Sequence, residues 1–135
     1  MTRILVIDDD LDVLQFLEMV LSSHKDCEVS KVCSTKEALA LVTHHKFDII
    51  FLDINMPEYT GHDFLNLYSA IHPDRATPVV IISADKTEAN VKRALNNGAV
   101  DFVPKPIFNK NSLIRILEKY CSFEAKNADE ELDAA

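Results

Sequence analysis

Apolar residues along the chain follow two different periods. Short, nearly continuous apolar runs, typical of buried strands, occupy residues 4–7, 47–52, 78–82 and 100–103, with a weaker run at 28–33. Between these runs, apolar residues recur every three or four positions, as on one face of a helix. Such stripes occupy residues 13–21, 38–42, 64–71, 91–95 and 113–121. The sequence therefore predicts five strands alternating with five helices.

A few polar residues indicate where these elements begin and end. Ser34 or Thr35 is expected to cap the second helix, with Glu37 near its positive end. The pair Asn97-Gly98 favours a left-handed end to the fourth helix. Pro78 would stand first in its strand, where proline is tolerated.

Buried strands that alternate with helices form a parallel sheet covered on both faces. The predicted fold is α/β, a doubly wound five-stranded parallel sheet in the flavodoxin-like order 2-1-3-4-5. We expect one folded domain over residues 1–121. Residues 122–135 hold five acidic residues and one lysine, and form either an acidic extension of the last helix or the start of a linker.

Composition excludes several classes of function. The net charge of −8 argues against nucleic acid or an anionic membrane as the direct partner. No apolar run reaches 18 residues and no signal peptide follows Met1, so we expect a cytoplasmic location. Only two glycines are present, which excludes a glycine-rich phosphate loop. The three cysteines show no C-x-x-C spacing and are expected to be reduced.

Polar side chains follow four of the predicted strands. Because ligands bind beyond the carboxyl ends of parallel strands, we expect these side chains to converge at one edge of the sheet. They are Asp8, Asp9 and Asp10 after the first run, Asp53 and Asn55 after the third, Ser83 and Asp85 after the fourth, and Lys105 after the fifth. Asp10 and Asp12 are expected to be acids of the first helical turn rather than ligands.

This combination of groups suits phosphoryl chemistry. Two carboxylates about 4 Å apart repel by roughly 4 kcal/mol at an effective dielectric near 20, and a hard cation such as Mg²⁺ or Mn²⁺ would remove that repulsion. An aspartate in such a site can attack phosphorus and form an aspartyl phosphate. A hydroxyl and a lysine can hold the remaining phosphoryl oxygens.

Four stretches together resemble a known family. They are ILVIDDD, FLDINMP with Gly61 following, VVIISA and GAVDFVPKP. In this order, each at a predicted strand end, they resemble the receiver domain of two-component response regulators, over about residues 2–121. The resemblance implies a phosphorylation-activated signalling switch, not an enzyme acting on a separate substrate.

The resemblance also implies a role for each matching residue. Asp53 would accept the phosphoryl group. Asp9 would bind Mg²⁺ directly, Asp8 largely through water, and Asn55 through its backbone carbonyl. The remaining implied roles are phosphoryl binding by Ser83 and Lys105, switching by Ser83 and Phe102, tuning of dephosphorylation by Asn55 and Asp85, and a cis bond before Pro106.

Partners follow from the same resemblance. A histidine kinase or a histidine phosphotransfer protein would donate the phosphoryl group. The face made by the fourth helix, fifth strand and fifth helix would bind an output domain or target protein. Val100 stands where many DNA-binding family members carry an acid, which weakens the expectation of a homodimer on activation and leaves it open.

The chain departs from the common pattern at two switch positions, and other functions stay open. Ser83 replaces the more usual threonine, and Phe102 lacks a tyrosine hydroxyl. A receiver-like binding module that works without phosphorylation remains an alternative. An aspartate-nucleophile phosphatase is disfavoured because Asp53-Ile54-Asn55 lacks a second acid, and a flavin mononucleotide site because Asp8, Asp9 and Asp10 would repel its phosphate.

Overall fold

A computed structural model of the chain describes residues 1–23, 26–56, 60–72, 77–105 and 110–121. Pro106 and the acidic segment 122–135 lie outside the described residues, so the predictions made for them are not addressed. Within the described residues, strands and helices alternate strictly. Their bounds are β1 Thr2–Ile7, α1 Leu11–Ser22, β2 Cys27–Val32, α2 Thr35–His44, β3 Ile49–Asp53, α3 Gly61–Ile71, β4 Val79–Ser83, α4 Glu88–Asn96, β5 Asp101–Pro104 and α5 Lys110–Tyr120.

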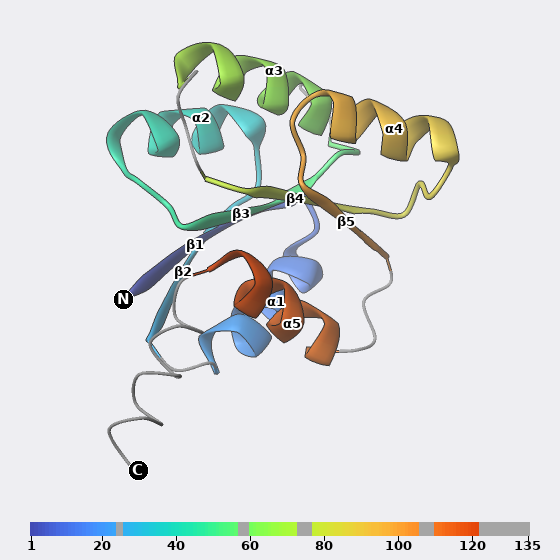
Figure 1. Cartoon of the computed structure of the whole chain (residues 1–135). Coiled ribbons are helices and arrows are strands. Elements are labelled where there is room, and N and C mark those ends of the chain that lie inside the picture. Colours follow the sequence, from blue (N-terminus) through green and yellow to red (C-terminus); the bar gives the residue numbers. More distant parts are fainter. Residues whose placement is uncertain (24–25, 57–59, 73–76, 106–109, 122–135) are drawn as a thin grey trace.

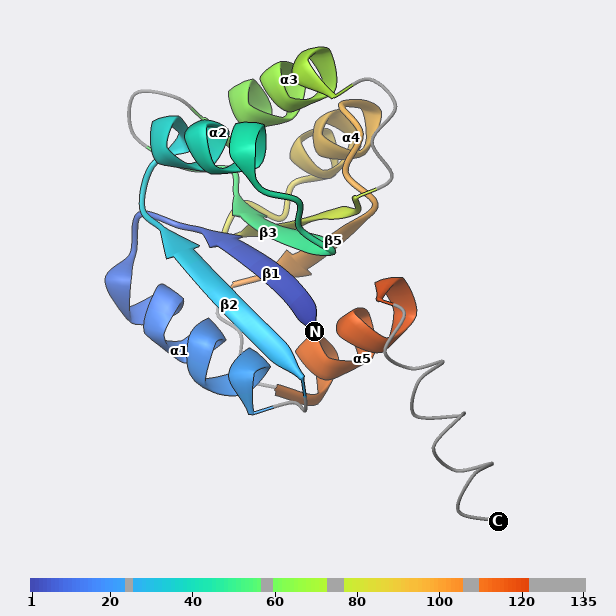
Figure 2. The ribbon, with the colours of Figure 1, turned by 90° about the vertical axis from the view of Figure 1, so that its left-hand side faces the viewer.

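The strands of the described chain form one parallel sheet of five in the order β2-β1-β3-β4-β5. Helices α2, α3 and α4 lie over one face of the sheet, and α1 and α5 lie over the other (Figures 1 and 2). The predicted fold class and strand order are therefore confirmed. The order reverses direction between β1 and β3, which is where parallel sheets open a crevice for ligands.

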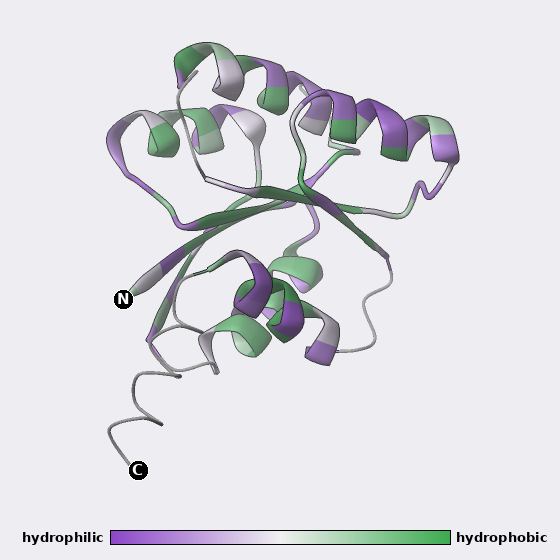
Figure 3. Ribbon diagram, viewed as in Figure 1, coloured by the Kyte–Doolittle hydropathy of each residue, from purple (hydrophilic) through white to green (hydrophobic). Residues whose placement is uncertain are grey.

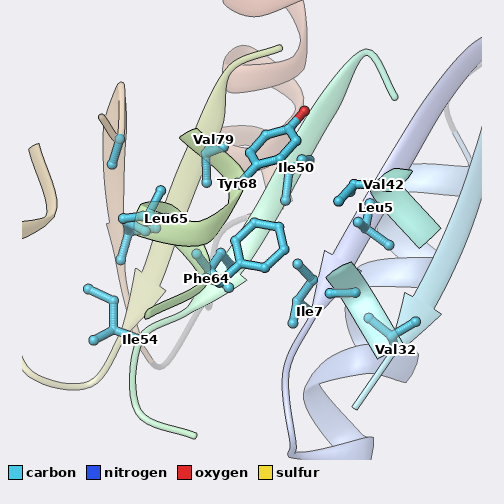
Figure 4. Close-up of a cluster of buried hydrophobic side chains, with 14 of the residues drawn as sticks. Leu5, Ile7, Val32, Val42, Ile50, Ile54, Phe64, Leu65, Tyr68 and Val79 are labelled. Atoms are coloured by element: carbon cyan, nitrogen blue, oxygen red, sulfur yellow. The ribbon is translucent and has the colours of Figure 1, made fainter. Parts of the chain in front are cut away.

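The near-continuous apolar strands are explained by burial on both faces. In β1, Leu5 and Ile7 point into the core beneath α2 and α3, whereas Ile4 and Val6 point toward α1 and α5. Hydrophobic residues accordingly mark the sheet between its two helical layers (Figure 3). Figure 4 shows the first of these cores, where the rings of Phe64 and Tyr68 from α3 lie over the sheet. Since successive strand residues face opposite sides, neither set could be polar.

Local polar residues set the helix ends. The side chain of Ser34, not that of Thr35, caps α2 by accepting a hydrogen bond from the Glu37 backbone N–H at 3.2 Å. Asp10 is the N-cap of α1 rather than a residue of its first turn, which corrects its predicted position by one residue. Gly98 has a φ of 109° just beyond α4, as the sequence predicts for a left-handed helix end.

Two residues that end predicted apolar stripes are exposed. Ile71 of α3 and Leu95 of α4 are each 45% exposed. Among the described residues of α4, Ala94 is the buried one, and the helix surface is largely hydrophilic (Figure 3). Periodicity alone therefore overestimated how firmly α4 packs on the sheet. None of the described helices combines the length and the apolar character that a membrane crossing requires.

Candidate functional site

Three carboxylates meet at the carboxyl edge of the sheet. One oxygen from each of Asp8, Asp9 and Asp53 lies within 4.8 Å of the others. Asp8 and Asp53 are buried, and Asp9 is exposed. The first two acids follow β1 and the third ends β3, so the parallel order of these neighbouring strands brings them together, as predicted.

Asp8 is held firmly by the backbone around it. Its own N–H donates to the Val32 carbonyl at 3.2 Å, and its Oδ1 accepts from the Asp10 N–H at 2.9 Å. Asp10 in turn caps α1 by accepting from the Asp12 N–H at 2.9 Å. The start of α1 and the end of β1 therefore fix the Asp8 carboxylate, which is 0% exposed.

Asp53 contacts both Asn55 and Lys105. Its Oδ1 accepts from the Asn55 N–H at 3.1 Å, and its Oδ2 accepts from the Lys105 ammonium at 3.3 Å. The same Lys105 nitrogen lies 2.8 Å from Oδ2 of Asp8. A backbone hydrogen bond of 2.9 Å from the Lys105 N–H to the Ser83 carbonyl positions the lysine beside the ends of β3 and β4.

This crowding changes the acidity of Asp53. Burial, and after it the nearby charge of Asp8, raise the pKa of its carboxyl to about 6. The Lys105 ammonium and the Asn55 N–H oppose the rise. For Lys105, burial lowers the pKa, but the two carboxylates outweigh it and raise the pKa overall. The lysine therefore stays charged, whereas the Asp53 carboxyl titrates not far below neutral pH.

Ser83 connects the site to the segment that begins α4. It is the last residue of β4 and is fully buried. Its Oγ accepts from the Asp85 N–H at 3.0 Å and from Nδ2 of Asn55 at 3.3 Å. The Asp85 carboxylate accepts from the Thr87 N–H at 3.1 Å, so it supports the start of α4.

Phe102 lies farther from the carboxylates. It is half-buried on β5 and packs against the core beneath α2, α3 and α4. The predicted site residues within the described chain thus lie at the ends of β1, β3, β4 and β5. Phe102 is the exception, because it lies two residues before the end of β5.

The sequence alone assigned no role to two residues near the site, Gly61 and His62. A Cβ on Gly61 would lie 2.6 Å from the Asp53 carbonyl oxygen, so α3 can approach the end of β3 only because residue 61 is glycine. The scarcity of glycine was a usable signal for this position. His62 is buried beside α4, and a single histidine in a helical stripe carries no such signal.

The donor set fits a divalent cation. One oxygen from each of three carboxylates gathers within 4.8 Å, and the Lys105 ammonium pairs with two of them, Asp8 and Asp53. Three negative charges therefore stand against one positive charge. Clustered carboxylate oxygens with excess negative charge suit a hard cation such as Mg²⁺.

Comparison with known proteins identifies the family. The model of the response regulator receiver domain matches residues 4–118. The response regulator ArlR of Staphylococcus aureus is 30% identical over 116 residues, which cover 86% of this chain and 51% of ArlR. The two-component response regulator ORR1 of Oryza sativa is 29% identical over 119 residues, covering 82% of this chain and 52% of ORR1. The chain therefore spans about half the length of these curated relatives.

Solved structures agree with the sequence comparison. The chemotaxis protein CheY4 of Vibrio cholerae superimposes with a TM-score of 0.81 at 27% identity, covering 89% of this chain and 98% of that one. The receiver domain of Francisella response regulator 1452 gives 0.79 at 28% identity, covering 89% of this chain and 96% of that one. The chain belongs to the receiver domain family of two-component response regulators.

Proposed function

We propose that the chain is a phosphorylation-activated switch whose phosphoacceptor is Asp53. The observation that carries the proposal is that Asp53 lies within 4.8 Å of the acidic pair Asp8 and Asp9 and 3.3 Å from the Lys105 ammonium. A nucleophilic carboxylate, a site for a cation and a fixed positive charge are the groups that phosphoryl transfer to aspartate requires.

Asp9, Asp53 and the backbone carbonyl of Asn55 would hold Mg²⁺ or Mn²⁺ directly, with Asp8 acting largely through water. The clustering of one oxygen each from Asp8, Asp9 and Asp53 within 4.8 Å supports this assignment. When bound, the cation neutralises negative charge that would otherwise keep an anionic phosphoryl donor away from the carboxylates.

The transfer uses the side chains of the chain itself. An Asp53 carboxylate oxygen attacks phosphorus of a phosphohistidine, the new O–P bond forms, and the P–N bond breaks with its electron pair going to the imidazole nitrogen. Lys105 and Ser83 would hold phosphoryl oxygens. Attack by water later breaks the P–O bond and restores the Asp53 carboxylate, at a rate tuned by Asn55 and Asp85.

Activation would pass through Ser83 to the face formed by α4, β5 and α5. To reach a phosphoryl group, the Ser83 hydroxyl has to exchange its present hydrogen bonds with Asp85 and Asn55. Phe102 would then turn toward the vacated space and alter this face. Leu95 and Val100, which are 45% and 42% exposed, already offer apolar surface there.

The partners follow from this cycle. The phosphoryl donor is a sensor histidine kinase or a histidine phosphotransfer protein in the cytoplasm. An output domain or a target protein binds the altered face, and a homodimer on activation stays open. The net charge of −8 does not favour direct contact with nucleic acid or a membrane surface.

Intact mass tests the proposal. Wild-type protein, Asp53→Asn and Asp12→Asn are incubated with acetyl phosphate, with and without Mg²⁺. Asp12 is an exposed acid outside the site, so Asp12→Asn is the control. We expect one Mg²⁺-dependent, hydroxylamine-labile phosphoryl adduct in wild type and in Asp12→Asn, and none in Asp53→Asn. Absence of the adduct in wild type, despite measurable Mg²⁺ binding, would favour a binding module that works without phosphorylation.

A further inference from the structure

His62 is a buried polar residue of α3 that contacts both ends of α4. Only 3% of its surface is exposed. Its Nε2 lies 3.1 Å from Oδ1 of Asn90 in the first turn of α4, and its Nδ1 lies 3.4 Å from Nδ2 of Asn97 at the C-cap. One ring therefore bridges almost the full length of this short helix.

The hydrogen bonds around the ring fix its tautomer. Nδ2 of Asn90 donates to the Asp85 carbonyl at 2.9 Å, so Oδ1 of Asn90 is the atom that faces His62. Nε2 of His62 must then carry the hydrogen, which leaves Nδ1 free to accept from Asn97. With hydrogen on Nε2, the ring bonds the side chains of Asn90 and Asn97 at once.

Helix α4 has little else to hold it in the described chain. Ala94 is its buried residue, Val91 is half-buried, and Leu95 is 45% exposed. Burial of an alanine side chain contributes less than burial of a leucine or phenylalanine, because less apolar area leaves water. Two partly buried hydrogen bonds, each worth about 1 kcal/mol net, are therefore a substantial part of the attachment of α4.

The ring is also anchored to the phosphoacceptor strand. Gly61, the residue before His62, donates its N–H to the Ile54 carbonyl at 2.8 Å, directly after Asp53. Residue 61 has no room to shift toward the strand, because a Cβ there would already meet the Asp53 carbonyl at 2.6 Å. His62 therefore has a fixed position relative to Asp53.

Asn90 receives a second connection from the site. Its amide holds the Asp85 carbonyl, and the Asp85 N–H holds the Ser83 hydroxyl. A movement of Ser83 disturbs this connection, whereas the bond from His62 to Asn90 does not depend on Ser83. Two connections therefore hold the start of α4. The one through Asp85 depends on the position of Ser83, and the one from His62 does not.

We propose that His62 is a positioning residue that fastens α4 to the end of β3 and limits how far α4 loosens when Asp53 is phosphorylated. The response to phosphorylation rests on the function proposed above, whereas the attachment of α4 in the unphosphorylated protein does not. The family resemblance of the chain assigns no role to this position.

Hydrogen exchange measured by mass spectrometry tests the inference, with intact mass recorded on the same samples. The variants are His62→Leu, which keeps a similar volume without hydrogen bonds, and His62→Gln, which keeps a donor near the position of Nε2. His44→Leu, at an exposed histidine on α2, is the matched control. Each protein is compared with and without acetyl phosphate and Mg²⁺.

We expect α4 amides of unphosphorylated His62→Leu to exchange about tenfold faster than in wild type, with strands β1 and β3 unchanged. Ten-fold corresponds to about 1.4 kcal/mol, close to the two lost hydrogen bonds. His62→Gln should restore protection in the first turn of α4 but not at its end. Phosphorylation should then increase α4 exchange by a larger factor in His62→Leu than in wild type, because the His62 bond to Asn90 remains only in wild type.

Two results would overturn the inference. One is α4 exchange in His62→Leu equal to that in wild type and His44→Leu. The other is equally faster exchange in β1, β3 and α4, which would make His62 a general packing residue. A wild-type protein that takes up no phosphoryl group would instead contradict the proposed function, while the unphosphorylated samples would still decide whether His62 holds α4.

Discussion

The ammonium nitrogen of Lys105 lies 2.8 Å from Oδ2 of Asp8, a carboxylate that is fully buried. This pair connects β1 to the segment after β5, across the width of β3 and β4. The same nitrogen lies 3.3 Å from Oδ2 of Asp53, so one lysine forms ion pairs with two buried carboxylates. The predictions below follow from that shared charge.

Asp53 should weaken the fold as pH rises in the absence of divalent cations. Its folded-state pKa of about 6 lies above the roughly 3.9 of an unfolded aspartate, so the folded protein holds more protons between these values. Its contribution to the free energy of unfolding is therefore fully present below about pH 4 and is lost as pH rises through about 6.

Urea unfolding of wild type and Asp53→Asn in chelator measures this contribution, because the amide does not titrate. The stability of wild type minus that of the variant should fall by on the order of 2 kcal/mol between pH 4 and pH 7. A difference that stays flat or rises with pH would contradict the charge arrangement around Asp53.

The affinity for Mg²⁺ should show the opposite pH dependence. A cation competes with the proton on Asp53, so binding strengthens as pH rises through about 6 and levels off above it. Calorimetry should give a dissociation constant at pH 5 at least about fivefold weaker than at pH 7.5. Asp12→Asn should behave as wild type, and equal affinity at both pH values would argue against Asp53 as a ligand.

Lys105→Met should destabilise the protein. It removes the cation beside Asp8 and leaves a buried carboxylate without compensation, a change that costs about 3 kcal/mol in typical proteins. Urea unfolding in chelator at pH 7.5 measures the loss, and Mg²⁺ should recover part of it. Lys119→Met is the control, because its side chain is 66% exposed and its ammonium lies 3.8 Å from the Asp101 carboxylate. Equal stability of the two variants would contradict this account.

Gly61→Ala should displace α3 from the end of β3. The added Cβ would lie 2.6 Å from both the Asp53 carbonyl oxygen and Cα of Ile54, and such overpacking costs about 1–3 kcal/mol. Thermal unfolding should show the loss, and intact-mass time courses should show slower phosphorylation of Asp53. Asn66→Ala, at an exposed position of the same helix, should leave both unchanged.

Asp85→Lys should lengthen the lifetime of the phosphorylated form severalfold, because an ammonium near the phosphoryl oxygens stabilises them and obstructs water. Decay of the adduct at saturating Mg²⁺ measures the lifetime. Asp85→Asn separates charge from structure, since it keeps an acceptor for the Thr87 N–H. An unchanged lifetime in Asp85→Lys would remove Asp85 from the tuning positions.

The sequence was sufficient for the sheet and for the acidic edge. Strands buried on both faces need apolar residues at consecutive positions, so β1, β3 and β4 were visible without tertiary information. Their order then placed Asp8, Asp9 and Asp53 together, since parallel strands end at the same edge. The same rule predicted that Ser83, at the end of β4, and Lys105, directly after β5, lie at this edge.

The sequence was less reliable where contact partners decide the outcome. Ile71 and Leu95 fit helical stripes but are each 45% exposed, because a stripe shows which face is apolar and not how much of it the sheet covers. Asp10 proved to be a cap, because its position depends on where α1 begins.

What the sequence by itself determined was the order of strands and helices, the set of polar residues at the strand ends, and the family to which they point. Only the tertiary structure decided that Lys105 serves both Asp8 and Asp53, that burial raises the pKa of Asp53, and that His62 holds both ends of α4. The physical reason is the separation along the chain of the residues that interact. Periodicity and capping act within a few residues, whereas burial, ion pairing and a shared histidine depend on distances between segments far apart in the chain.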